Sequence, residues 1–252
     1  MTTRTEDLPN VRPDRMFVLI LSLTFFLPLI AQAEELAAGQ VTHLSGTFVA
    51  KRTDGSVRVL GIQSAIRAGD QLSTEADTYA RIKFRDGSEV VLRPNTRFVV
   101  EQYQFEAEAP AKDNFITRLL KGGLRAVSGL LGQRSREKVE YRTTVATIGI
   151  RGTNHGMLLC DNDCADIQTA SGEPPADGLH VDVVSGEVEV RNRGGRQSVG
   201  SGQFAFARNN DNPPTLVPAG QGFQVTMPQS ISQNDAGGRS VGGQARDTGC
   251  NL

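Results

Sequence analysis

The sequence predicts an all-β protein, built as an antiparallel sandwich or a short β-solenoid and followed by a disordered C-terminal tail. Short runs rich in Val, Thr and Phe recur along the chain, as is typical of strands. Glycine is abundant, with 27 of 252 residues, and tryptophan is absent. This mixture favours short strands joined by tight turns over long helices.

The strand prediction is clearest between residues 40 and 104. Asp-Gly pairs at 54–55 and 86–87 mark two hairpin turns between apolar runs. Residues 79–84 alternate between aromatic or charged side chains and the apolar Ala80, Ile82 and Phe84. Such alternation is typical of a strand with one buried face. We expect further strands at 89–92 and 97–104, and residues 105–114 read as a polar loop.

Strand-like sequence resumes after residue 140. Residues 141–150 are rich in Thr and Val, and residues 157–159 form a short apolar run. Residues 180–190 read as a strand pair broken at Ser185-Gly186, and residues 203–207 as one more strand. Beyond Met227 the sequence is mainly Gln, Asn, Ser and Gly, so residues 228–252 are predicted to be disordered.

The segment 115–131 fits two structures. Its apolar residues have roughly helical spacing, and its basic residues would give the polar face of a membrane-surface helix. Gly122, Gly123 and Gly129 together would destabilise such a helix by roughly 2–3 kcal/mol relative to alanine. An extended segment kinked at the glycines is the favoured interpretation.

The first 33 residues have the three zones of a secretory signal peptide. An arginine-containing flank precedes the uncharged run 16–30, and Ala31-Gln32-Ala33 places small residues where a signal peptidase cleaves. The apolar run is about 15 residues long, whereas a membrane span needs roughly 20. We expect cleavage and export to the periplasm of a Gram-negative bacterium, with an uncleaved inner-membrane anchor facing the periplasm as the alternative.

The remaining chain, from residue 34, is long enough for one large domain or two small ones. The net charge of the whole sequence is −1, and the predicted signal peptide contains equal numbers of acidic and basic residues. Because no basic excess exists, the sequence gives no indication of nucleic-acid binding.

Two of the three cysteines, Cys160 and Cys164, enclose a short polar loop, and Cys250 lies apart in the tail. An exported protein meets an oxidising compartment, so we expect a local Cys160–Cys164 disulfide. A structural zinc site would need further Cys or His at ligand spacing, which this loop lacks.

No catalytic constellation, cofactor motif or metal motif emerges, and the chain is interpreted as a non-enzyme without a cofactor. His43 and His180 lie in or beside predicted strands, while His155 lies in a polar turn where a ligand-binding role is the less favoured reading. A nucleophile-elbow pattern at 238–242 lacks the strand and helix that expose such a serine.

Two charged clusters are candidate ligand sites. The acidic loop carries Asp161, Asp163 and Asp166 but lacks the glycine and terminal glutamate of a known calcium loop, so a solvated turn is favoured. Basic residues that share one predicted face are interspersed with Asp86 and Glu89, which favours a mixed solvated surface over an anion site. These basic residues are Arg81, Lys83, Arg85, Arg93 and Arg97.

The run 39–100 contains Ser45-Gly46, the 68–70 turn, and Asp86-Gly87 followed by Ser88 and the strand 90–92. With these landmarks, the run resembles the FecR domain of bacterial envelope proteins. The segment 119–129 (LLKGGLRAVSG) and the segment 144–153 are also similar to that family. The second segment contains the motif residues Gly149, Ile150, Arg151, Gly152 and Thr153. The resemblance extends to about residue 208 and implies an all-β periplasmic domain, which we place at 34–227.

Family members that regulate iron-uptake sigma factors carry a cytoplasmic domain and a membrane span before this domain. Here only about 15 residues precede the apolar run. We therefore expect a stand-alone binding, sensing or scaffolding module that recognises an envelope protein or ligand. The alternative is a membrane-tethered receiver in FecR-like signalling to a sigma factor, and a cell-wall or carbohydrate-active enzyme is a third reading.

Overall fold

A computed structural model describes residues 1–2, 36–169 and 172–232 of the chain. The first part of the sheet contains β1 (Gly39–Leu44), β2 (Phe48–Lys51), β3 (Val57–Leu60), β4 (Ala65–Ile66), β5 (Gln71–Thr74), β6 (Ala80–Phe84), β7 (Glu89–Leu92) and β8 (Arg97–Gln104). The second part contains β9 (Asn114–Val127), β10 (Val139–Arg142), β11 (Thr147–Cys160), β12 (Gly178–Asn192), β13 (Gly195–Gly200), β14 (Phe204–Ala207) and β15 (Thr215–Val217). The helices are short: α1 (Leu130–Arg134), α2 (Gln229–Ser232) and the 3-10 turns Pro110–Lys112 and Arg136–Lys138.

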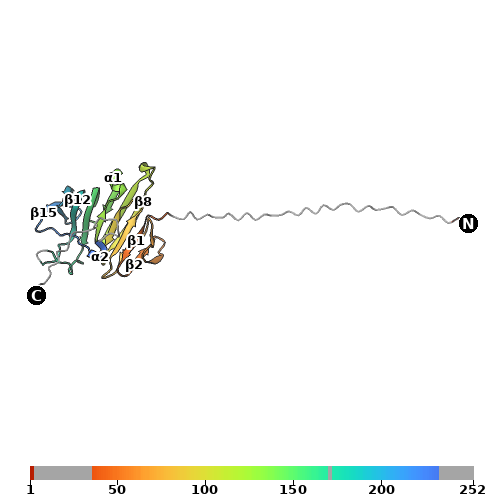
Figure 1. Cartoon of the computed structure of the whole chain (residues 1–252), viewed down its shortest axis with the longest axis horizontal. Coiled ribbons are helices and arrows are strands. Elements are labelled where there is room, and N and C mark those ends of the chain that lie inside the picture. Colours follow the sequence, from red (N-terminus) through yellow and green to blue (C-terminus); the bar gives the residue numbers. More distant parts are fainter. Residues whose placement is uncertain (3–35, 170–171, 233–252) are drawn as a thin grey trace. The chain divides into compact units, whose positions relative to one another are not determined.

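The described strands form one open sheet of 15 strands, which confirms the all-β prediction. Its longest path runs β15-β14-β12-β11-β10-β9-β7-β6-β1-β4, and a branch continues from β9 through β8, β5 and β2 to β3. Neighbouring strands are antiparallel except for the parallel pair β9–β10. In Figure 1 the colours pass from orange through green to blue across the sheet, so most neighbouring strands are also close in the sequence.

Strand β9 joins the two branches. Its first half pairs with β8 as far as Lys121, and its second half pairs with β7 and β11. The change occurs at Gly122, whose φ of +80° favours glycine and where a Cβ would lie 2.8 Å from the Thr96 Cα. The kinked, extended interpretation of 115–131 is therefore confirmed for 114–127, and the membrane-surface helix is wrong.

Two predicted strands have different limits in the structure. The run 141–150 divides into β10 and β11, because the Thr143 Oγ1 accepts hydrogen bonds from the N–H groups of Val145 (3.0 Å) and Ala146 (2.9 Å) and closes a turn. Conversely, the predicted break at Ser185-Gly186 is a bulge within the continuous strand β12. Gly186 has a φ of +81°, and a Cβ there would lie 2.3 Å from the Gly152 carbonyl oxygen.

The main core lies on one face of β9, β11 and β12 and extends under both branches. Alternating aliphatic residues of these strands fill it, together with a chain of aromatic contacts that runs from Phe84 through Phe115 to Tyr141. Phe84 and Phe115 have ring centroids 4.7 Å apart. Burial of such large apolar side chains is the main stabilising term for a domain of this kind.

Parts of the predicted organisation lie outside the described residues. These include the predicted signal peptide from residue 3 onwards, Cys250 and the pattern at 238–242. The ordered chain extends past the predicted boundary at Met227, because α2 buries Ile231 against the sheet. Within the described ranges, no helix combines the length and the apolar composition that crossing a bilayer requires.

Candidate functional site: a face of the sheet covered by a C-terminal strap

The second face of β9, β11 and β12 carries a buried ion pair. The strand register aligns Arg125 of β9 with Gly156 of β11, and Gly156 with Asp182 of β12. Because Gly156 has no side chain, Arg125 and Asp182 meet above it, with the Arg125 Nη2 and the Asp182 Oδ2 2.6 Å apart. A Cβ at Gly156 would lie 2.2 Å from the Asp182 Oδ1. A glycine at this register position is therefore required for the pair to form.

Residues 222–232, which we call the strap, cover this ion pair. The Val225 carbonyl accepts hydrogen bonds from Arg125 Nε (2.9 Å) and Nη2 (2.6 Å), and the Val225 N–H donates to the Asp182 Oδ1 (2.9 Å). The Arg125 Nη1 donates to the Asn154 Oδ1 at 3.0 Å. The ion pair thus forms hydrogen bonds with both the C=O and the N–H of Val225. Because Arg125 also bonds Asn154, the strap is linked to β9, β11 and β12.

Apolar contacts complete the attachment of the strap. A second buried cluster, separate from the main core, joins strap residues to the sheet and to the disulfide loop; its members are Val91, Leu158, Cys160, Cys164, Val225, Met227 and Ile231. At the far end, the Ile231 carbonyl accepts a hydrogen bond from the Arg81 Nη1 at 3.4 Å. This contact agrees with Figure 1, where blue α2 is drawn near the orange strands β1 and β2. The strap therefore crosses the strands from β14 to β6.

Burial shifts the pKa of the acidic member of this pair. Desolvation raises the pKa of the Asp182 carboxyl, and the Arg125 charge, its hydrogen bond and the Val225 N–H act against that increase. The Arg125 side chain has no exposed area and that of Asp182 is 3 % exposed. Both groups are saturated by protein partners, so this arrangement holds the strap and leaves no polar atom of the pair free to bind a solute.

His155 lies on the opposite face, in the main core. Its Nδ1 is 3.0 Å from the Thr153 Oγ1, and its ring makes an edge contact with Tyr141 at a centroid distance of 4.9 Å. Desolvation, and secondarily the Arg125 charge, lowers the pKa of His155 to about 3. The sequence placed this residue in a polar turn, whereas the structure places it within β11 with no exposed area. His155 is therefore a neutral histidine packed in the main core.

The motif residues Asp86 and Gly87 build the β6–β7 turn and anchor the start of α1. The Asp86 Oδ1 accepts a hydrogen bond from the Ser88 hydroxyl (2.7 Å), and its main-chain carbonyl accepts one from the Leu130 N–H (2.9 Å). Gly87 has a φ of +82°. At Gly129, the last residue of the similar segment 119–129, a Cβ would lie 2.4 Å from the Asp86 carbonyl oxygen. Two motifs distant in the sequence therefore meet at one tight junction.

The motif 149–153 forms the start and the bulge of β11. Ile150 is buried in the main core, while Arg151 is exposed and lies 3.7 Å from the Glu187 carboxylate. Gly149 and Arg151 line a surface hollow of about 270 Å³ with other charged residues. Gly152 has a φ of +63°, and the register shifts just after it. This bulge places Thr153 beside Ser128 and Asn154 beside Arg125, so the motif positions the ion pair indirectly.

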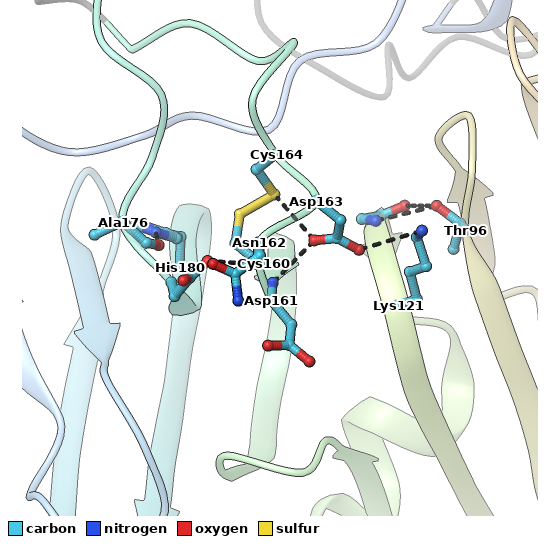
Figure 2. The surroundings of a disulfide bond; sticks show 11 residues. Thr96, Lys121, Cys160, Asp161, Asn162, Asp163, Cys164, Ala176 and His180 are labelled. Atoms are coloured by element: carbon cyan, nitrogen blue, oxygen red, sulfur yellow. Dashed lines mark hydrogen bonds and ion pairs between the residues drawn. A yellow bond between two sulfur atoms is a disulfide. The ribbon is translucent and has the colours of Figure 1, made fainter.

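The structure contains a disulfide between Cys160 and Cys164, at the end of β11 (Figure 2). Within the loop, the Asp163 Oδ1 accepts the Asp161 N–H at 2.9 Å, and the Asp163 Oδ2 lies 3.4 Å from the Lys121 Nζ. Figure 2 shows Asp163 pointing toward Lys121 and Asp161 pointing away from it. Among the described residues, no group of three acidic, His or Cys side chains is arranged to hold a metal ion.

The predicted basic face divides among several environments. Arg81 is buried beneath the strap, and Lys83 lies 4.0 Å from the Glu89 carboxylate. Arg85 donates to the Phe105 carbonyl at 2.5 Å. Arg93 lies over the Phe223 ring at 6.0 Å, and Arg97 is exposed on β8. Because these side chains lie on different strands and layers, the structure does not bring them together as one anion-binding surface.

His180 lines a hollow of about 290 Å³ that is bounded by Thr169, residues 173–176, β14 and the start of the strap. Its Nε2 lies 2.8 Å from the Ala176 carbonyl oxygen, and its ring contacts Phe206 at a centroid distance of 4.8 Å. Figure 2 shows the His180 ring beside Ala176. Burial lowers the pKa of His180. The neutral ring therefore packs as part of an aromatic wall that includes Phe223.

The sequence analysis placed Arg125 only on the basic face of a possible membrane-surface helix, and it singled out neither Asp182 nor the strap. Each charged residue interrupts an apolar run, LRAV in β9 and VDVV in β12. A charged residue inside a strand that is otherwise apolar on both sides is a signal for a buried pair. The partner assignment needed the register, which the sequence did not provide.

Together these features define an all-β domain whose second sheet face is sealed by its own C-terminal segment. The family model described as FecR protein matches residues 70–189. The chain therefore contains a FecR domain, which confirms the resemblance drawn from the sequence. The matched segment begins within the predicted core motif and ends in β12, so it includes Arg125 and Asp182 but not the strap.

Solved structures give a weaker likeness. Two crystal structures, at 2.50 and 1.65 Å resolution, of a protein described as a putative anti-sigma factor from Parabacteroides distasonis are 15% identical to this chain, with a TM-score of 0.42. The alignment covers 58% of this chain and 58% of that chain. No curated protein matches the sequence.

Proposed function

We propose that this chain is the signal-receiving component of a FecR-type regulatory system in the bacterial cell envelope. The β domain receives a signal through contact with another envelope component, and the regulatory system passes this signal to a sigma factor that controls transcription. The observation that carries the proposal is the FecR match over residues 70–189. That segment contains the two most specific sequence motifs, on β9 and β11.

In this proposal the β domain lies in the periplasm, and residues 16–30 are retained as an inner-membrane anchor. The uncharged apolar character of 16–30 supports a membrane or export role. The Cys160–Cys164 disulfide supports an oxidising compartment, because such bonds rarely persist in the cytosol.

The buried polar groups of the domain support recognition over catalysis. Arg125 and Asp182 bond each other and the strap, and His155 packs in the main core. A catalytic group must come within hydrogen-bond reach of its substrate. Each of these three residues is at most 2 % exposed, so other protein atoms cover its side chain. The domain thus offers surfaces for contact, and these groups with shifted pKa values stabilise the fold.

The test compares gene expression in a strain lacking this protein, the same strain complemented with the whole chain, and the parent strain. We expect one group of genes with a shared promoter class to change several-fold on deletion and to return on complementation, measured by RNA sequencing. A matched control replaces residues 1–33 with an established cleavable signal peptide, and this untethered form should fail to restore expression. Unchanged transcripts in the deletion strain, across envelope stresses and iron limitation, would refute the signalling role.

An untethered periplasmic binding or scaffolding module is the second candidate, and Ala31-Gln32-Ala33 favours it. The two candidates differ in the N-terminus of the mature protein. Sequencing the chain isolated from cells would give Glu34 as the first residue for the untethered module and a retained 16–30 segment for the receiver.

A further inference from the structure

The buried ion pair offers the strap the hydrogen bonds that a neighbouring strand would offer. In an antiparallel sheet, the N–H and C=O of one residue can both bond a single residue of the next strand. Val225 bonds the ion pair in the same way. Its N–H donates to the Asp182 carboxylate at 2.9 Å, and its C=O accepts from the Arg125 guanidinium at 2.6 and 2.9 Å. The pair thus recognises backbone groups, which any residue except proline provides.

The surroundings of the pair add a requirement for the side chain. Val225 has no exposed area, and a Cβ at Gly156 would lie 2.7 Å from the Val225 Cβ, so the missing side chain of Gly156 makes room for it. Met227 is 7 % exposed and Ile231 1 % exposed, and both belong to the same buried apolar cluster. The face under the strap is therefore a groove that fits an aliphatic residue over Gly156 and a second apolar residue two positions later.

The strap is attached as a ligand would be, and not as a strand of the sheet. It belongs to no strand of the described sheet, so its removal breaks no pair of the β-ladder. The residues on either side of Val225, Gln224 and Thr226, are exposed and form no hydrogen bond with the described residues. Residues 218–221, which precede the strap, are exposed as well. The strap can therefore leave the groove while the strands stay paired.

The groove and the strap lie in different parts of the chain. Arg125, Gly156 and Asp182 lie within the segment 70–189 that the FecR family model matches, whereas the strap lies beyond its end. The residues that recognise a backbone thus belong to the FecR segment, and the residues that cover them do not.

We propose that the strap is an autoinhibitory segment in a peptide-binding groove, and that an extended segment of the envelope partner displaces it. The incoming segment places an aliphatic residue over Gly156, with its N–H on Asp182 and its C=O on Arg125, and a second apolar residue at the position of Met227. Main-chain hydrogen bonds give such a contact its affinity, and the alternate side chains give it specificity. This inference rests on the proposed function, since it names the surface through which the receiver contacts its partner.

The test uses the full chain as isolated from cells and a fluorescent peptide with the sequence of residues 221–232. In the wild-type chain the tethered strap competes at a roughly millimolar effective concentration, so the peptide should bind weakly. Val225→Pro removes the N–H that bonds Asp182, which loosens the strap and leaves the residues of the groove unchanged. Fluorescence anisotropy should show that the peptide binds this variant at least about tenfold more tightly than the wild type.

Two N-methylated peptides separate backbone recognition from apolar contact. A methyl group on the nitrogen of the residue equivalent to Val225 removes the N–H and keeps the side chain. It should weaken binding to the Val225→Pro chain by about tenfold or more. The matched control carries the methyl group at the position of Thr226, whose N–H donates no hydrogen bond to the described residues. This peptide should bind within about threefold of the unmodified one.

A variant of the groove tests the second half of the recognition. Arg125→Lys, combined with Val225→Pro, keeps a positive charge beside Asp182 but lacks the planar donors that bond the C=O. The peptide should bind this double variant about tenfold more weakly than Val225→Pro alone. Circular dichroism must show that each variant is folded. If the double variant does not fold, the two N-methylated peptides still decide the question.

Three results would overturn the proposal. The first is equal binding of the peptide to the wild-type and Val225→Pro chains, and the second is equal weakening by the two N-methylated peptides. The third is a dimer of the wild-type chain, detected by light scattering, that the peptide dissociates. That dimer would mean that the strap of a second copy is the occupant of the groove.

The transcript comparison described above is a separate measurement. Failure of the peptide to bind, together with normal transcript changes on deletion, would reject the groove and keep the signalling role. Selective binding of the peptide with unchanged transcripts would reject signalling and keep the groove.

Discussion

The two faces of β9, β11 and β12 are held together by different interactions. On the face toward the main core, aliphatic residues of many strands interdigitate, and polar groups are few. On the face under the strap, a small apolar cluster surrounds one buried ion pair, Arg125–Asp182. Neighbouring residues of the same strand take part in both, since Arg125 faces the strap and Ala126 faces the core.

The difference determines how each face responds to change. An apolar core distributes its stabilisation over many contacts, so a single conservative change costs little when the volume is kept. A buried ion pair concentrates the stabilisation in a few atoms, because removal of one partner leaves the other charge buried without compensation. The core should therefore tolerate conservative substitution, whereas attachment of the strap should depend on a few atoms.

Removal of the Arg125 charge should have the largest effect. Arg125→Met keeps much of the side-chain volume but leaves the Asp182 carboxylate buried and the Val225 carbonyl without its donors. We expect a loss of about 3–5 kcal/mol in the free energy of unfolding, measured by urea denaturation. Limited proteolysis should show cleavage within residues 222–232 under conditions in which the wild-type strap is resistant.

The matched control is the double variant Arg125→Met with Asp182→Leu. It removes both charges, so the penalty of an unpaired charge disappears and much of the lost stability should return. Simple addition of the two single losses in the double variant would contradict the view that the pair acts as one unit. Ile148→Val in the main core, where about 1 kcal/mol is expected, sets the scale for a conservative change on the other face.

Which features of the two faces could be predicted from the sequence depends on how far apart in the chain the interacting residues lie. Turn chemistry and alternation are local, so the Asp86-Gly87 turn, the alternation in β6 and the kink at Gly122 could all be predicted. The pairing of Arg125 with Asp182 depends on the register of three strands, and a shift by one residue would send either side chain to the other face.

The strap shows the same limit. Its sequence, GFQVTMPQSIS, has few apolar residues and resembles the polar tail that follows it. Its order comes from hydrogen bonds between Val225 and groups on β9 and β12, which no local pattern reveals. His155 was assigned to a turn because its neighbours are Gly, Thr and Asn, yet these small residues form a bulge inside a strand.

His155 on the core face gives the next largest effect, a decrease in the free energy of unfolding as the pH is lowered. The pKa of His155 is about 3 in the folded protein, below its ordinary value of 6.5, because burial disfavours the charged form. Between these values the unfolded chain binds a proton that the folded chain does not, so stability falls as the pH decreases. From about pH 7 to about pH 4.5 this contribution should cost about 2–3 kcal/mol.

Urea denaturation of the wild-type chain and of His155→Gln at the two pH values measures this cost. The variant should lose about 2–3 kcal/mol less than the wild type on acidification, whatever its stability at neutral pH. His43→Asn, near the end of β1, is the matched control for the replacement of a histidine. An equal pH response of His155→Gln and the wild type would show that His155 is accessible to protons in the folded state.

Loss of the disulfide should have a smaller effect than loss of the Arg125 charge or acidification, although it concerns the face under the strap. The Cys160–Cys164 loop is short, so its closure restricts the unfolded chain little, and the double variant Cys160→Ala with Cys164→Ala should lose about 2 kcal/mol at most. Both cysteines also belong to the buried cluster that contains Val225 and Met227, so part of that loss is apolar contact. Comparison of the reduced wild type with the double variant separates the two parts, because the reduced chain keeps both side chains. A loss as large as that of Arg125→Met would mean that the disulfide loop, rather than the ion pair, holds the strap on the sheet.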